Sequence, residues 1–161
     1  MKKIIATGLF CFILQFLQAQ VSYYKGEWTE VNSGVLFAGI FKLDIVNKVE
    51  VKGELLWTYL AADSADGTMI DQYKDKKGSW GIEYVSGAFN PVTNDLYVEG
   101  KEKKDPFAVI GLDKYTLKLS SDKRVIYGKT DSNGKNNGLF YSYKISTAQG
   151  IKLFNTAKAG L

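Results

Sequence analysis

Histidine is absent from the sequence, and the one cysteine, Cys11, lies within an apolar run near the N-terminus. Histidine-dependent serine or cysteine triads, histidine metal sites and imidazole acid–base catalysis are therefore excluded. Carboxylate, lysine and tyrosine chemistry remains. Because acids such as Glu50, Glu54 and Glu99 occupy the polar positions of alternating segments, they fit a solvated surface. The residue types favour a protein that is not an enzyme, and we expect neither a cofactor nor a metal.

Glu83 is the acid whose position could give it a function. If Val85 and Phe89 face the interior of a sheet, Glu83 shares their face, and a buried carboxylate must be paired or have its pKa raised. The opposite face of the same segment carries Ile82 and Tyr84, so both phases stay open and the pattern favours solvent exposure of Glu83. A glycosidase-like enzyme would need a second acid in the same cleft, which spacing along the chain cannot show.

Aromatic side chains form the main candidate binding surface. On alternating segments they share a face with aliphatic residues, so we expect them to line the interior, where a tyrosine hydroxyl needs a partner. With Glu83 in its inward phase, the candidate ligand-binding residues are Phe37, Phe41, Trp57, Tyr59, Glu83, Tyr115 and Tyr141, with Tyr143 on the same face. Gly39, Gly53 and Gly100 leave room among them, so the interior either holds one small molecule or is filled by its own side chains.

The elements that must position these residues are strands, because apolar and polar residues alternate with a period of two from Gly26 onward. Short segments rich in Asn, Asp, Gly and Ser separate the runs, as hairpin turns require. The sequence predicts about eight strands, which begin near Gly26, Val35, Val49, Ser79, Asp95, Val109, Arg124 and Gly138. We therefore expect an all-β fold, an antiparallel up-and-down meander.

A loose glycine repeat favours closure of this meander into a barrel. An apolar residue, any residue and a glycine recur at 51–53, 85–87, 98–100 and 126–128, each time inside a predicted strand. Glycine within a strand usually marks a bend, a bulge or a close backbone approach. Its recurrence across neighbouring strands indicates a sheet that is curved enough to close.

Residues 1–20 have the parts of a secretory signal peptide: a basic start, an apolar run of roughly 14 residues and a small residue before the expected cleavage site. The run is shorter than the roughly 20 residues of a membrane-spanning helix, and no later segment approaches that length. We expect a secreted or periplasmic protein with no integral membrane span after processing. Removal of Lys2 and Lys3 would lower the formal net charge from +4 to +2, which disfavours nucleic acid as a partner.

The remaining chain divides into a β-barrel domain at 21–146 and a C-terminal tail at 147–161. Residues 61–78 are the least strand-like part of the domain and are expected to form a long loop. The tail contains Ile151, Leu153 and Phe154, and it either forms a short helix against the barrel or remains loose, with partial order expected.

Gly26-Glu27-Trp28 at the start of the first predicted strand, followed by a meander of about eight strands, resembles the calycin group of barrels, which includes lipocalins, fatty-acid-binding proteins and avidins. In lipocalins this element closes one barrel end, and a basic residue of the last strand lies over the indole. The resemblance therefore implies a structural role for Trp28. The sequence departs from that pattern because Arg124 falls on the seventh predicted strand, and the last strand offers Lys144.

Two functions follow from these expectations. The first is an exported, lipocalin-like barrel that binds a small apolar or amphipathic ligand. The second is a non-catalytic envelope interaction or structural domain with a filled core, which would contact a protein partner or a second copy through outward apolar positions. Those outward positions are Ala38, Ile40, Leu56, Leu60 and Phe140.

Overall fold

The computed structural model describes residues 20–31, 34–62, 75–132 and 135–159. Their strands are β1 (Gln20–Glu30), β2 (Val35–Val46), β3 (Glu50–Ala62), β4 (Trp80–Asn90), β5 (Asp95–Lys104), β6 (Lys114–Leu119), β7 (Val125–Ser132) and β8 (Lys135–Ile145). One helix, α3 (Thr147–Ala159), follows β8. Residues 1–19, where the signal peptide is expected, lie outside the described part, as does most of the loop expected at 61–78.

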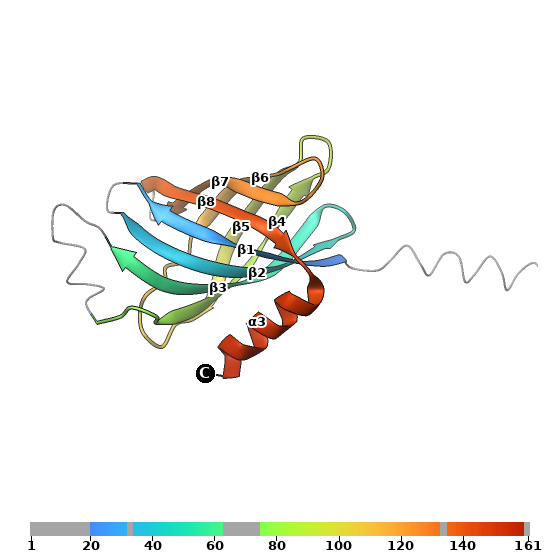
Figure 1. The fold of residues 1–161 in the computed structure, drawn as a ribbon. Coiled ribbons are helices and arrows are strands. Elements are labelled where there is room, and N and C mark those ends of the chain that lie inside the picture. Colours follow the sequence, from blue (N-terminus) through green and yellow to red (C-terminus); the bar gives the residue numbers. More distant parts are fainter. Residues whose placement is uncertain (1–19, 32–33, 63–74, 133–134, 160–161) are drawn as a thin grey trace, which may run out of the picture.

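The eight strands form a closed antiparallel barrel in which each strand pairs with its neighbour in the sequence and β1 pairs with β8 (Figure 1). This confirms the expected all-β meander. At the turn between β2 and β3, Asn47 and Lys48 have φ values of 50° and 65°, and Val49 donates a hydrogen bond to Val46 O at 3.1 Å. Such a turn matches the right-handed twist of its strands.

Glycines lie where neighbouring backbones approach most closely. A Cβ atom on Gly87 of β4 would lie 1.9 Å from Tyr97 O of β5, and one on Gly26 of β1 would lie 2.5 Å from the Cβ atom of Ser142 on β8. The register between β4 and β5 also shifts between Tyr84 and Val85. These features let a sheet of eight strands bend tightly enough to close.

Alternate residues of each strand fill the barrel. Near the 46–49, 91–94 and 120–124 turns the interior is largely aliphatic, with Val51, Val85, Leu96 and Ile126 all at most 4% exposed. The connections after β1, β3, β5 and β7 lie at the other end, and the residues near it are mainly aromatic and polar. The barrel interior is thus mainly aliphatic near one end and has a different chemistry near the other.

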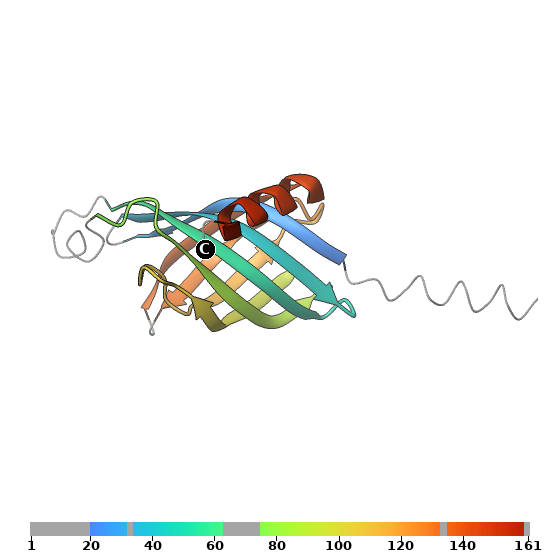
Figure 2. The same cartoon turned by 90° about the horizontal axis from the view of Figure 1, so that it is seen from below.

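Helix α3 covers part of the outer wall. Ser146 and Gln149 form a reciprocal N-terminal cap, in which Gln149 N donates to Ser146 Oγ at 3.3 Å and Ser146 N donates to Gln149 Oε1 at 3.2 Å. The helix then runs back along the barrel (Figure 2), where Phe154 packs with Tyr23, Leu56 and Ile82. Of the two alternatives for the tail, the helix against the barrel is therefore the one observed, and it gives these strands a second buried face.

Candidate functional site

Glu83 points into the barrel and is 1% exposed. The expectation that its side chain faces solvent is wrong, because β4 keeps Val85 and Phe89 on the inward face, and Glu83 shares their phase. Ile82, on the opposite face, is also buried, but against α3 outside the barrel. The helix thus explains why the apolar pattern of β4 has two possible phases.

Three donors from three elements hold the Glu83 carboxyl group. The hydroxyl of Tyr115 on β6 makes a short hydrogen bond to Oε2, and the indole Nε1 of Trp57 on β3 donates to the same atom at 3.4 Å. The backbone N of Asp113, just before β6, donates to Oε1 at 2.9 Å. The carboxyl therefore connects β3, β4 and the start of β6 within the barrel.

Gly100 of β5 provides the space that the carboxyl occupies. A Cβ atom at this position would lie 2.0 Å from Glu83 Oε1. The backbone N of Gly100 donates a hydrogen bond to Asp113 O at 2.9 Å. This bond holds the segment whose backbone also binds Glu83. The sequence indicated that Gly100 leaves room in the interior, but it did not indicate that Gly100 or Asp113 lies beside Glu83.

Burial raises the pKa of Glu83 to about 7, and the charge of Asp113 adds to the rise, while the three hydrogen bonds oppose it. Burial, together with the charge of Glu83, raises the pKa of Tyr115 well above its usual value. Tyr115 therefore stays protonated and donates, whereas Glu83 exchanges its proton near neutral pH. The carboxyl is ionisable under conditions in which most glutamates are fully charged.

An aromatic cluster packs beside this polar group. The Phe41 ring lies 4.8 Å from the rings of Trp57 and Phe140, and the Tyr115 ring lies 6.0 Å from that of Phe140. Phe37 continues the cluster toward the barrel end, at 5.5 Å from Tyr59. The structure thus brings six of the seven sequence-predicted site residues into the interior, namely Phe37, Phe41, Trp57, Tyr59, Glu83 and Tyr115.

Tyr141 is the exception, and its expected place in the interior is wrong, as is that of Tyr143. Tyr141 is 57% exposed on the outer face, while Phe140 is 3% exposed and points inward. Ser142 faces inward as well, directly opposite Gly26, where the two backbones leave space for only a small side chain. That close approach sets the phase of β8 and places both tyrosines outside.

Trp28 lies at the barrel end that contains Glu83. Its Nε1 donates to Thr130 Oγ1 at 2.6 Å, and its ring lies 5.6 Å from that of Phe37. Lys144 pairs with Tyr24, four residues before Trp28 on β1, rather than lying beside the indole. Trp28 thus connects β1, β2 and β7 at this end of the barrel through a hydroxyl partner.

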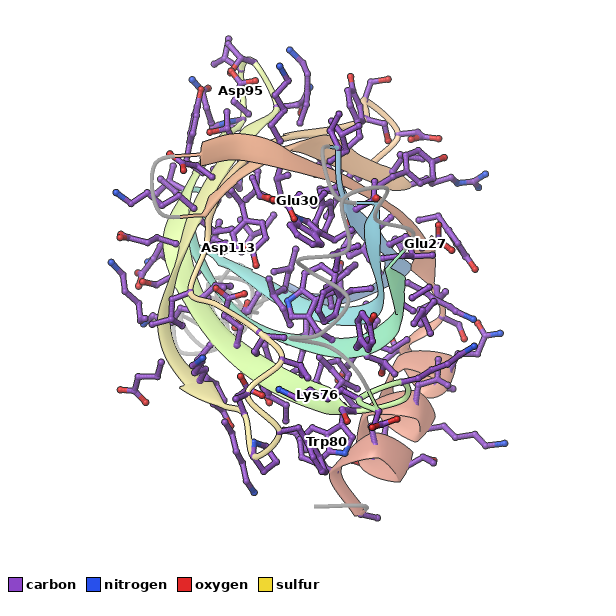
Figure 3. The ribbon with its side chains drawn as sticks, turned by 90° about the vertical axis from the view of Figure 1, so that its left-hand side faces the viewer. Glu27, Glu30, Lys76, Trp80, Asp95 and Asp113 are labelled. Atoms are coloured by element: carbon purple, nitrogen blue, oxygen red, sulfur yellow. The ribbon has the colours of Figure 1, made fainter. Side chains whose placement is uncertain are left out.

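The connection between β5 and β6 folds over this end of the barrel. The Asp105 carboxyl accepts hydrogen bonds from Val109 N at 2.9 Å and Ile110 N at 3.0 Å, and Val109 is 3% exposed in the core. Figure 3 looks along the barrel from this end, with Asp113 and Glu30 inside the ring of strands and Trp80 outside it. Acidic groups and aromatic rings therefore meet at the barrel mouth.

Within the described ranges, no group of three or more metal-ligating side chains is close enough to hold an ion. The same residues include no helix with the length and apolar character of a membrane span. Comparisons with protein-family models, with curated proteins and with solved structures found no match.

Proposed function

We propose that this protein is an exported, lipocalin-like barrel that binds one small amphipathic molecule at the end that contains Glu83. The observation that carries the proposal is the Glu83 carboxyl, buried among Trp57, Tyr115 and the Asp113 backbone. Because the carboxyl is 1% exposed, a ligand reaches it only by displacing side chains around it.

A buried acid is costly for a barrel that could be filled with apolar side chains alone. Removal of a carboxyl group from water costs free energy even when it is hydrogen-bonded, and an apolar replacement is often neutral or stabilising. Ionisable groups with shifted pKa values occur preferentially at functional sites. The cost at Glu83 is therefore better explained by a polar anchor for a ligand than by stability.

The chemistry of this end favours a ligand that donates hydrogen bonds. A carboxylate can accept about four hydrogen bonds, and the protein supplies one to Oε1 and two to Oε2. Asp113 adds negative charge beside it. We expect the ligand to present an amino or hydroxyl group to this end and an apolar part to the aromatic cluster.

Ligand size is limited by the packing. Phe41 and Leu55 are 0% and 2% exposed, so side chains fill the described interior beneath Glu83. A ligand must occupy the barrel end, above the aromatic cluster, and must displace ring edges of Phe37 or Tyr59 to reach the carboxyl. We therefore expect a molecule of the size of a single ring or a short alkyl chain.

Native mass spectrometry and tryptophan fluorescence test this proposal with three probes of equal chain length: an alkyl amine, an alkyl alcohol and a fatty acid. We expect the amine to bind best and the acid worst, and Glu83→Gln to reduce the preference for the amine at pH 8. Trp80→Phe is the matched control, since Trp80 lies outside the barrel near Phe107. Binding of none of the probes, or preference for the fatty acid, would contradict the proposal.

Export is the second part of the proposal, and it rests on the basic start and the apolar run of residues 1–20. Cleavage after Gln20 would remove only the first residue of β1, which spans Gln20–Glu30. N-terminal sequencing of the protein from cell fractions tests it. An intact Met1 in the cytoplasmic fraction would contradict export.

A filled core supports a second candidate, a non-catalytic interaction or structural domain. The aromatic cluster leaves little space at its centre, since the Phe140 ring lies within 6.0 Å of those of Trp57 and Tyr115. Under this alternative the outer face carries the function. Failure of all three probes, together with a specific protein or self contact, would favour it.

A further inference from the structure

A tyrosine-rich surface lies on the outer wall of β7 and β8. Leu139, Tyr141 and Tyr143 are alternate residues of β8 and are 47%, 57% and 47% exposed. Tyr127 of β7 is 45% exposed and pairs directly with Tyr141. Helix α3 packs on Tyr23 of β1, Leu56 of β3 and Ile82 of β4, on the side of the barrel away from β7 (Figure 1). We call these four residues the tyrosine face.

Two opposite charges on β1 border the tyrosine face. Lys25 pairs with Tyr143, and Glu27 pairs with Tyr141, so the charges lie two residues apart on one strand and point outward. Neither forms an ion pair with another residue of the described part of the chain. The β1 border thus presents one cation and one anion beside adjacent exposed rings, and Lys129 of β7, which pairs with Leu139, adds a second cation at the opposite border.

We infer that the tyrosine face is the interface of a symmetric homodimer. In a two-fold contact the same surface meets itself, so residue i of one copy faces residue j of the other and the reverse. An axis that passes between Lys25 and Glu27 sets each lysine against the glutamate of the other copy. The surface is therefore complementary to itself in charge, which is the argument for a second copy as its occupant.

The residue types of the tyrosine face also favour a second copy of the chain as its partner. Tyrosine is enriched at protein interfaces, where the ring buries area and the hydroxyl keeps a polar partner. A closed barrel has no strand edge to offer, so strand pairing is excluded and self-association must use side-chain surfaces such as this face. Four half-exposed large side chains supply roughly 400 Å² of the ~800 Å² per partner in a standard interface. We therefore expect a weak dimer that dissociates in the micromolar range.

Charge reversal distinguishes this interface from nonspecific association. Sedimentation velocity of the purified protein should show a reversible dimer. Lys25→Glu or Glu27→Lys alone places like charges against each other, and each should weaken dimerisation by at least about tenfold. Mixing these two variants should produce a heterodimer, because each lysine then meets a glutamate again. The double variant K25E/E27K should also dimerise.

Controls come from equivalent residues elsewhere on the barrel. Tyr97 of β5 is 50% exposed outside the tyrosine face, so Tyr97→Ala should leave the dimer intact while Tyr141→Ala weakens it. Lys104→Glu repeats the charge reversal away from the interface. A protein that stays monomeric at about 100 µM, well above the expected micromolar range, would overturn the inference. A dimer that resists both single reversals would overturn it as well. Neither result depends on ligand binding at the barrel end.

Discussion

The Oε1 atom of Glu83 lies 2.0 Å from the position that a Cβ atom on Gly100 would occupy. The Glu83 carboxyl group on β4 therefore occupies the space that a side chain at position 100 on β5 would need. Because three donors hold the carboxyl, it cannot move away without losing hydrogen bonds. Gly100 is thus required by the position of Glu83.

Gly100→Ala should lower the free energy of unfolding by about 1–3 kcal/mol, since it displaces a buried carboxyl from its donors. Urea unfolding at pH 7 measures this loss. In a Glu83→Ala background the oxygen is absent, so the same substitution should cost less. Equal losses in both backgrounds would show that Gly100 and Glu83 are not coupled.

The stability of the protein should depend on the protonation of Glu83. Its pKa is about 7 in the folded protein and near 4.5 when the side chain is free, so the folded state binds the proton more tightly. The stabilisation is fully present below about pH 4.5 and is lost as the pH rises to 7, by about 3 kcal/mol at most. Above pH 7 the carboxyl is charged in both states and the contribution is constant.

Urea unfolding between pH 5 and 8, compared with Glu83→Gln, checks this dependence. The wild-type free energy of unfolding should fall over this range, and the variant should show a much flatter profile. The contribution of Glu54 to the pH dependence has the opposite sign. Burial raises the pKa of Glu54, but ion pairs with Lys158 and Lys42 outweigh that effect and lower the pKa. Its contribution is lost only as the pH falls below its normal pKa. A wild-type profile that rises from pH 5 to 8 would contradict the assignment.

Tyr115→Phe should destabilise the protein more when Glu83 is ionised than when Glu83 is protonated. The hydroxyl lowers the pKa of Glu83 by donating to it, so its loss should raise that pKa further. Hydrogen bonds to charged groups contribute more than those to neutral ones, and we expect a loss of about 2 kcal/mol at pH 8. The loss at pH 5 should be smaller. Carboxyl carbon NMR of Glu83 measures the pKa directly, and an unchanged value would refute the coupling.

The fold could be predicted from the sequence because the alternation is local. Strands β2 and β3 place Phe37, Phe41 and Trp57 on one face and charged residues on the other, so their phase is unambiguous. Turn residues such as Asn47 and Lys48 then set the order of the hairpins. Closure itself depends on contacts between β1 and β8, which the glycine repeat only indicated.

The site was less predictable because it depends on long-range contacts. The phase of β4 was ambiguous since Phe154, far away in the sequence, buries Ile82 from outside the barrel. The phase of β8 is set by Gly26, which faces Ser142 across the closing pair of strands. Large aromatic residues alone predicted the wrong face there. The donor at Asp113 is a backbone N–H group, so no residue type in the sequence could have revealed it.

Helix α3 should contribute to barrel stability mainly through Phe154. Its side chain is 4% exposed, packs with Tyr23 at a ring distance of 6.1 Å, and contacts the cluster that includes Leu56 and Ile82. Phe154→Ala removes this packing and leaves a cavity or an exposed apolar patch. We expect a loss of about 3 kcal/mol in the free energy of unfolding.

Ile151→Ala is the matched control, since Ile151 is on the same helix and is 45% exposed. It should change stability by less than about 0.5 kcal/mol. Hydrogen exchange separates two ways in which Phe154→Ala could act. If the helix detaches, amides of residues 147–159 lose protection while the strands keep theirs; if the helix is part of one cooperative unit, β3 and β4 lose protection too. Because Leu56 and Ile82 depend on the helix for burial, we expect the second result, and protection retained in β3 and β4 would show that the barrel is stable without its outer helix.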